Sequence, residues 1–388
     1  METDAVYAAL VAFAAAAMLT PAVARFARRL GAVDELKARG LAREATPLLG
    51  GLAIFAGALI AALLFMPEGE RTRGILVAAA LITLVGAWDD VRDLPPGAKL
   101  AGQVVAALIL VNAGVEVRNI TFPFVGAVSF GDAGGPLTVL GLVAVMNVVN
   151  FSDGVDGLAA GVCAISSIAF AVIAFDLGRD SAGVLAAITA GAAIGFLGHN
   201  FHPASIFMGD CGSNLLGLLL GAVIVEGSLK TNALVALVGP LVILAVPFLD
   251  TGFVVAKRIK YRRPVYRADS NHFHHRFHRI GFSQRRTVLY LYAWTITMAG
   301  LAVALRFIPY SDNHGHLDPG WTAALAACFL VALAASAYLI YVLEILKLRR
   351  LRAWQLRHVD PETTEFEIDE EVRRELETGE FRALDPRY

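Results

Sequence analysis

Apolar runs long enough to cross a lipid bilayer follow one another along almost the whole chain. Hydrophobic residues make up 57% of the 388 residues and charged residues 17%, and the mean hydropathy is +0.62. Soluble domains of this length are much less apolar, and only helices and closed barrels satisfy their backbone polar groups within lipid. The sequence therefore predicts an all-α polytopic membrane protein.

Eleven runs are separated by Gly, Pro or charged breaks, and each is expected to form a transmembrane helix. They lie near 5–25, 48–66, 74–88, 99–114, 137–151, 157–177, 182–199, 213–228, 232–256, 287–307 and 321–346. Several are shorter than a full crossing, so their helices should extend into neighbouring polar residues. Residues 115–136 are expected to form a small external hairpin or a re-entrant loop. Residues 1–346 then form one multi-span membrane domain, followed by a charged cytoplasmic tail over 347–388.

Positive charge sets the orientation. Glu2 and Asp4 precede the first run and Arg25 follows it, the reverse of a cleavable signal peptide. The first helix is therefore expected to keep its N-terminus outside. Counting on from there, the inside segments hold 27 of the 33 Lys and Arg residues, as the positive-inside rule requires. The C-terminus then lies inside.

Two classes of function receive no support from composition. The net charge of −1 provides no field for nucleic acid. Cys163, Cys211 and Cys328 are scattered, without metal or disulfide spacing, so no redox role is assigned to them.

The same orientation places four polar clusters at the cytoplasmic face. Asp89 and Asp90 end the third run, Asp93 follows one turn later, and Lys99 opens the fourth run. Adjacent carboxylates can hold a divalent cation, and a nearby ammonium can neutralise a phosphate. The alternative is an ordinary charged helix end.

The second cluster repeats every third residue at the end of the fifth run: Asn147, Asn150, Asp153 and Asp156. This spacing points the side chains one way, and amide and carboxylate oxygens are ligands of hard cations. As an alternative, Asn residues can join helices within a bilayer. Two Asn and two Asp in so short a segment exceed that need.

The third cluster joins two spans, from Asn200 to Asp210, which stands between Gly209 and Gly212. The glycines allow a tight turn that presents this carboxylate. His202 is expected to be a loop residue rather than a ligand.

The fourth cluster lies in the largest inside loop and comprises His272, His274, His275 and Arg276. These groups can bind a diphosphate or, at other spacing, zinc. Oxygen ligands elsewhere favour magnesium and leave the histidines for phosphate or sugar. Positive-inside charge alone would explain the arginines but not the histidines.

In order, these clusters resemble the polyprenyl-phosphate N-acetylhexosamine-1-phosphate transferase superfamily, glycosyltransferase family 4. The motifs are D-D-x-x-D, N-x-x-N-x-x-D-G-x-D-G-L, F-M-G-D-x-G-S and H-x-H-H-R, preceded by P-L-L-G-G at 47–51. Phe273 and Arg276 resemble the branch of undecaprenyl-phosphate N-acetylglucosaminyl-1-phosphate transferases. The branch that makes the first lipid intermediate of peptidoglycan tends to carry three consecutive histidines and an acidic residue. Segment 43–46 lacks the histidine that members often have, so no substrate contact is assigned there.

The resemblance implies transfer of N-acetylglucosamine-1-phosphate from UDP-N-acetylglucosamine to undecaprenyl (polyprenyl) phosphate, with release of UMP, in the bacterial inner (plasma) membrane. It implies Mg²⁺ as the cofactor, with Mn²⁺ as the alternative metal. Asn150 and Asp210 would coordinate the metal, Asp89 and Asp90 would lie at the reacting phosphates, and Lys99 would steady the diphosphate. The substrate-binding residues implied are Asp153, Asp156, Asn200, His272, His274, His275 and Arg276.

Other readings stay open. The donor sugar could instead be UDP-MurNAc-pentapeptide or an N-acetylated deoxyhexose. Asp89 could act as base, as nucleophile or only in positioning, and the chain could form a homodimer among the membrane lipids. A cation-coupled transporter would place its polar groups near the bilayer midplane, often in two repeated halves, whereas these lie at span ends. An intramembrane metalloprotease would need an H-E-x-x-H helix, which the chain lacks.

Overall fold

The computed structural model describes residues 2–34, 46–122, 126–228, 283–308 and 318–344, together with Leu244 and scattered positions of the tail. The expected span at 232–256, the cluster from His272 to Arg276 and most of the tail lie outside the described residues. Within these ranges ten α-helices stand where ten of the spans were predicted, and seven are long and apolar enough to cross a membrane. The prediction of an all-α polytopic membrane protein is confirmed. The full number of spans and their orientation stay predictions.

The helices extend past the apolar runs into the polar clusters, as expected from the short runs. Helix α3 includes Asp89 and ends where Asp93 adopts a left-handed conformation with φ of 39°. The bounds are α1 (Glu2–Leu30), α2 (Gly51–Phe65), α3 (Glu70–Arg92), α4 (Pro96–Asn112), α5 (Gly134–Ser152), α6 (Leu158–Asp176), α7 (Asp180–Asn200), α8 (Gly209–Ser228), α12 (Gln284–Phe307) and α13 (Pro319–Glu344).

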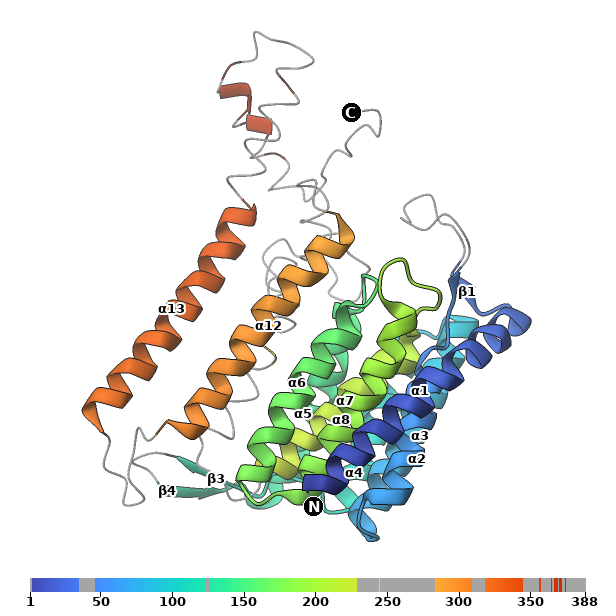
Figure 1. Ribbon diagram of the computed structural model, residues 1–388, viewed down its shortest axis with the longest axis horizontal. Coiled ribbons are helices and arrows are strands. Elements are labelled where there is room, and N and C mark those ends of the chain that lie inside the picture. Colours follow the sequence, from blue (N-terminus) through green and yellow to red (C-terminus); the bar gives the residue numbers. More distant parts are fainter. Residues whose placement is uncertain are drawn as a thin grey trace.

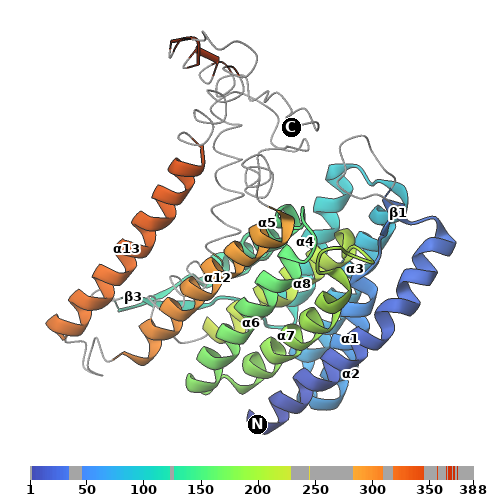
Figure 2. The same cartoon turned by 45° about the horizontal axis from the view of Figure 1, so that its top comes forward.

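Helix α8 lies inside the bundle, where it packs against α3, α5 and α7 (Figures 1 and 2). Its apolar side chains are almost fully buried, including Leu215, Leu216 and Leu220. Helix α1 packs along α7 and α2, α12 packs on α6, and α13 stands beyond α12 (Figure 1). The residues at the start of α8 are therefore surrounded by other helices.

Small residues allow close approach around the start of α8. A Cβ on Gly51 of α2 would collide with the backbone of Gly212, and one on Gly86 of α3 would collide with the backbone of Cys211. Small residues at such contacts are common in membrane proteins because association there depends on close packing. Both α2 and α3 therefore touch the backbone of α8 directly.

Two short antiparallel pairs complete the described structure. Strand β1 (Val33–Asp34) pairs with β2 (Thr46–Pro47), and β3 (Asn119–Phe122) pairs with β4 (Gly126–Ser129). The second pair is the hairpin expected within 115–136. It lies at the same end of the bundle as the N-terminus, whereas β1 lies at the other end (Figure 1).

The outer surface of the bundle carries large apolar side chains. Met18 is 78% exposed, and Leu63 and Leu140 are each 68% exposed. Many exposed large apolar side chains indicate contact with lipid or another protein. On helices of this length they are suited to the acyl chains of membrane lipids.

Candidate active site

Three acidic side chains from separate parts of the sequence meet at one end of the bundle. Asp89 and Asp90 come from the end of α3, and Asp210 comes from the start of α8. One carboxylate oxygen from each lies within 4.8 Å of the others. The structure thus brings together the first and third polar clusters predicted from the sequence.

Lys99, at the start of α4, joins two of these carboxylates. Its Nζ lies 2.5 Å from Asp89 Oδ2 and 3.1 Å from Asp210 Oδ2. The other oxygen of Asp89 accepts a hydrogen bond of 2.7 Å from the Leu94 amide. The Asp89 side chain is 7% exposed and that of Lys99 is 37% exposed. Lys99 is therefore the more accessible member of this pair, and Asp89 is buried beside it.

Asp90 has a different task from its neighbour. Its two oxygens accept hydrogen bonds from the backbone amides of Asp210, at 2.7 Å, and Cys211, at 3.2 Å. Such amides at a helix start have no partner within the helix and carry its positive dipole. Gly209 has φ of 72°, and a Cβ there would collide with Asp90. Asp90 thus caps α8 and fixes the backbone that carries Asp210.

Asn150 reaches the same place from the end of α5. Its Nδ2 donates to Ser213 Oγ at 3.0 Å, and Ser213 Oγ donates to the Gly209 carbonyl at 3.1 Å. Asn150 also contacts the Asp210 side chain. The second cluster therefore joins the site through Asn150.

Asp153 stands in the turn between α5 and α6. Burial raises the pKa of its carboxyl group to about 8, with further contributions from the negative charges of Asp210, Asp90 and Asp156. Its carboxyl group is thus mainly protonated at neutral pH when no cation is bound. A bound divalent cation would oppose this shift.

Asp156 and Asn200 form hydrogen bonds with the turn that follows α7. Asp156 Oδ2 lies 2.8 Å from His202 Nδ1 and accepts from the Ala204 amide at 3.1 Å. Asn200, 1% exposed, accepts from the Gly157 amide at 2.9 Å and donates to the Ile206 carbonyl at 2.9 Å. Contact of these two residues with a nucleotide stays a prediction.

The segment at 47–51 holds the loop that precedes Asp210. The Phe207 amide donates to the Pro47 carbonyl at 2.8 Å. In return, the Gly50 amide donates to the Phe207 carbonyl at 3.0 Å and the Gly51 amide donates to the Met208 carbonyl at 2.9 Å. The P-L-L-G-G and F-M-G-D motifs, far apart in sequence, thus support each other.

Comparison with known proteins agrees with this arrangement. The profile of glycosyl transferase family 4 matches residues 72–228, which run from α3 to the end of α8. A Bacillus subtilis protein named as a probable undecaprenyl-phosphate N-acetylglucosaminyl 1-phosphate transferase is 36% identical over 304 residues, covering 78% of this chain and 85% of that protein. This chain belongs to glycosyl transferase family 4.

Two further relatives mark the branches of the family. A decaprenyl-phosphate N-acetylglucosaminephosphotransferase of Mycobacterium tuberculosis is 38% identical over 322 residues, covering 75% of this chain and 80% of that protein. A phospho-N-acetylmuramoyl-pentapeptide-transferase of Desulforudis audaxviator is 34% identical over 333 residues, covering 76% and 96%. Family 4 membership makes the chain a membrane phosphoglycosyl transferase.

Several residues that support the site of this family 4 transferase were not singled out from the sequence. Tyr292 of α12 donates to the Gly157 carbonyl at 2.5 Å, and Arg285 donates to the His202 carbonyl at 3.0 Å. Gln103 and Asn214 lie below the acidic cluster. The sequence does contain a signal for these two residues. Gln103 follows Lys99 by four positions and Asn214 follows Asp210 by four, so each polar residue shares a helix face with a predicted site residue.

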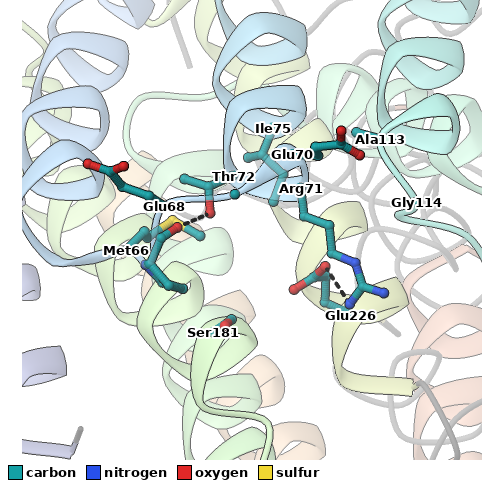
Figure 3. A pocket seen from close by; sticks show the side chains of 12 residues that line it. Met66, Glu68, Glu70, Arg71, Thr72, Ile75, Ala113, Gly114, Ser181 and Glu226 are labelled. Atoms are coloured by element: carbon teal, nitrogen blue, oxygen red, sulfur yellow. Dashed lines mark hydrogen bonds and ion pairs between the residues drawn. The ribbon is translucent and has the colours of Figure 1, made fainter.

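The transferase also has a cavity of about 530 Å³ far from the acidic cluster. Arg71 and Glu226 both line it, and Figure 3 shows their side chains next to each other, with 3.7 Å between Nη1 and Oε1. Its lining includes Glu70, which begins α3, whereas Asp89 lies near the other end of that helix. This cavity is therefore not part of the candidate active site.

Proposed function

We propose that this chain transfers N-acetylglucosamine-1-phosphate from UDP-N-acetylglucosamine to undecaprenyl or another polyprenyl phosphate and releases UMP. Relatives with names of this kind, 36–38% identical, support the choice of sugar. The observation that carries the proposal is the convergence of Asp89, Asp210 and Lys99 from three helices. That convergence provides carboxylates for a cation and an ammonium for a diphosphate at one point.

The cofactor in this proposal is Mg²⁺, with Mn²⁺ as the alternative metal. The donor set fits a hard cation because Asp210 and Asn150 offer oxygen atoms, whereas Lys99 and the Leu94 amide already engage the two oxygens of Asp89. Asp90 is less suited, since backbone amides already engage both its oxygens. Asn150 directs its Nδ2 at Ser213, and a half-turn of the amide would present Oδ1 instead. When bound, the metal would offset the charge of two approaching phosphates.

In the proposed reaction, an oxygen of the lipid phosphate attacks the β-phosphorus of the UDP-sugar. The bond between this phosphorus and the bridging oxygen breaks, and UMP leaves with the electron pair. A phosphate monoester has a second pKa of about 6, so the acceptor is mostly dianionic at neutral pH and needs no base. Asp89 then positions Lys99, whose ammonium contacts the diphosphate.

The soluble donor and the lipid acceptor meet at the end of the bundle where Lys99 is accessible. The proposed location is the inner membrane, with this end at the cytoplasmic face. His272, His274, His275 and Arg276 are proposed to hold the phosphate or sugar part of the donor, and they lie outside the described residues.

The test is UMP release by the purified chain in detergent, with undecaprenyl phosphate and a panel of UDP-sugars. We expect turnover with UDP-N-acetylglucosamine that requires both the lipid and Mg²⁺ or Mn²⁺. Turnover without lipid or without metal would contradict the mechanism. Preference for UDP-MurNAc-pentapeptide or another N-acetylated sugar would leave the mechanism in place and reject the donor.

A further inference from the structure

A chain of side-chain amides crosses the bundle just below the acidic cluster. Asn147 of α5 donates from Nδ2 to Gln103 Oε1 of α4 at 2.7 Å. Gln103 Nε2 donates to Asn214 Oδ1 of α8 at 2.7 Å, and Asn214 Nδ2 donates to the Asp210 carbonyl at 2.9 Å. We call Asn147, Gln103 and Asn214 the amide relay.

Each member of the relay lies one helical turn from a residue of the candidate site. Gln103 follows Lys99 by four positions on α4, and Asn214 follows Asp210 by four on α8. Asn147 precedes Asn150 by three on α5. Residues three or four apart share a helix face. The three helices that supply Lys99, Asp210 and Asn150 are therefore joined to one another directly beneath these side chains.

Gln103 and Asn214 are buried and Asn147 is partly buried, which makes the pairing of the relay sensitive to helix position. Gln103 is 5% exposed and Asn214 is 6% exposed, and Ala106 and Leu215 on the same helices are fully buried. Leaving a buried amide without a hydrogen-bond partner destabilises the folded state. Sliding α4 by one turn against both α5 and α8 would break the two bonds of Gln103 and replace them with apolar contacts. Single buried Asn residues set helix register in coiled coils in the same way.

We propose that the amide relay sets the axial register of α4, α5 and α8, and that Gln103 is a positioning residue for Lys99, Asn150 and Asp210. The role of the relay toward a metal rests on the proposed function, whereas its role in helix register does not. Loss of the relay moves the oxygen atoms and the ammonium apart without removing any group that touches substrate.

The first test measures Mn²⁺ binding to the purified full chain, without donor or lipid acceptor, from the EPR signal of free Mn²⁺. Gln103→Met keeps the length of the side chain but removes its hydrogen bonds, and Asn214→Leu breaks the next link. We expect each variant to bind Mn²⁺ at least 10-fold more weakly than the unmodified chain. The double variant should bind no more weakly than either single variant, because both break one connected unit.

The matched control is Thr189→Val on α7, which removes a fully buried hydrogen bond of 2.8 Å to the Leu185 carbonyl, outside the relay. Its Mn²⁺ affinity should equal that of the unmodified chain. Weakening equal to that of Gln103→Met would assign the effect to general loss of stability. Unchanged Mn²⁺ affinity in a folded Gln103→Met variant would also overturn the metal-positioning role.

The second test measures helix register without metal, by pulsed EPR between spin labels on Gly97→Cys in α4 and Phe151→Cys in α5, in a Cys328→Ser background. Both labelled positions are exposed at the same end of the bundle. We expect one narrow distance that shifts or broadens when Gln103→Met is added, and an unchanged distance would overturn the relay. An unmodified chain that binds no Mn²⁺ would reject the proposed metal site alone. Failure of both single relay variants to fold would assign the relay to stability and overturn the positioning role.

Discussion

Neighbouring aspartates at the end of α3 have different partners because successive residues on a helix point in different directions. Asp89 contacts the Lys99 ammonium, whereas Asp90 contacts the first backbone amides of α8. The sequence predicts that both lie near the reacting groups. Only the packing of α8 against α3 shows that Asp90 holds Asp210 in position.

Replacing Asp210 with Asn should lower UMP release at least about 100-fold, the range seen when a group that stabilises transition-state charge is lost. The side chain keeps its size but loses the charge that Lys99 contacts and the oxygen proposed for the metal. Asp93→Asn is the control, since Asp93 is exposed at a left-handed position that Asn tolerates. Near-normal turnover of Asp210→Asn would remove Asp210 from the metal site.

Metal binding should depend on pH through Asp153. Burial raises the pKa of this carboxyl group to about 8, and nearby negative charges add to the shift. Below this pH the carboxyl group is mostly protonated, and the positive charge of a cation bound nearby favours loss of the proton. The apparent Mn²⁺ affinity should therefore rise from pH 6.5 to pH 8 and level off above it. Titrations at fixed pH measure this, and the slope should become shallower in Asp153→Asn; an unchanged slope there would assign the proton to another group.

Close packing of small residues determines how the helices present the site. Gly51 at the start of α2 lies against Gly212 of α8 and donates to the Met208 carbonyl. The position of α2 is thus linked to the loop before Asp210. The cost of a larger side chain there should appear in both stability and activity.

Gly51→Ala should lower the midpoint of thermal unfolding in detergent and reduce turnover, because the new Cβ meets the α8 backbone and pushes α2 away. Gly141→Ala is the matched control on α5, where a Cβ would meet no atom within 4 Å. Its midpoint should stay unchanged or rise slightly, since Ala favours a helix over Gly by about 1 kcal/mol. Equal midpoints for both variants would contradict the close α2–α8 contact.

At the scale of the whole molecule, the sequence predicts the helices well because each apolar run is bounded by charged, Gly or Pro residues. It also predicts that Asp89, Asn150 and Asp210 lie close together, since each is at the end of a predicted span that faces the cytoplasm. The hydrogen-bond pairing within the amide relay could not be predicted, because it depends on how α4 packs between α5 and α8. The pattern of polar and apolar residues along one helix does not show which neighbouring helix each polar residue will contact.

The orientation of the protein in the membrane can be tested by labelling cysteines that replace two exposed glycines at opposite ends of the bundle. Gly69 precedes α3 and Gly97 lies at the start of α4, and a Cβ at either position meets no atom within 4 Å. In a Cys328→Ser background, Gly69→Cys should react with a membrane-impermeant maleimide in intact cells. Gly97→Cys should react only after the membrane is permeabilised. The reverse pattern would place the candidate active site outside the cell.

The most direct test of the metal site is the position of Mn²⁺ in crystals of the full chain, from its anomalous scattering. We predict one peak roughly 2.0–2.4 Å from oxygen atoms of Asp210 and Asn150, a distance typical of hard cations, and its loss in Asp210→Asn. No peak at this cluster in crystals soaked with Mn²⁺, or a peak that persists unchanged in Asp210→Asn, would contradict a divalent ion held jointly by α5 and α8.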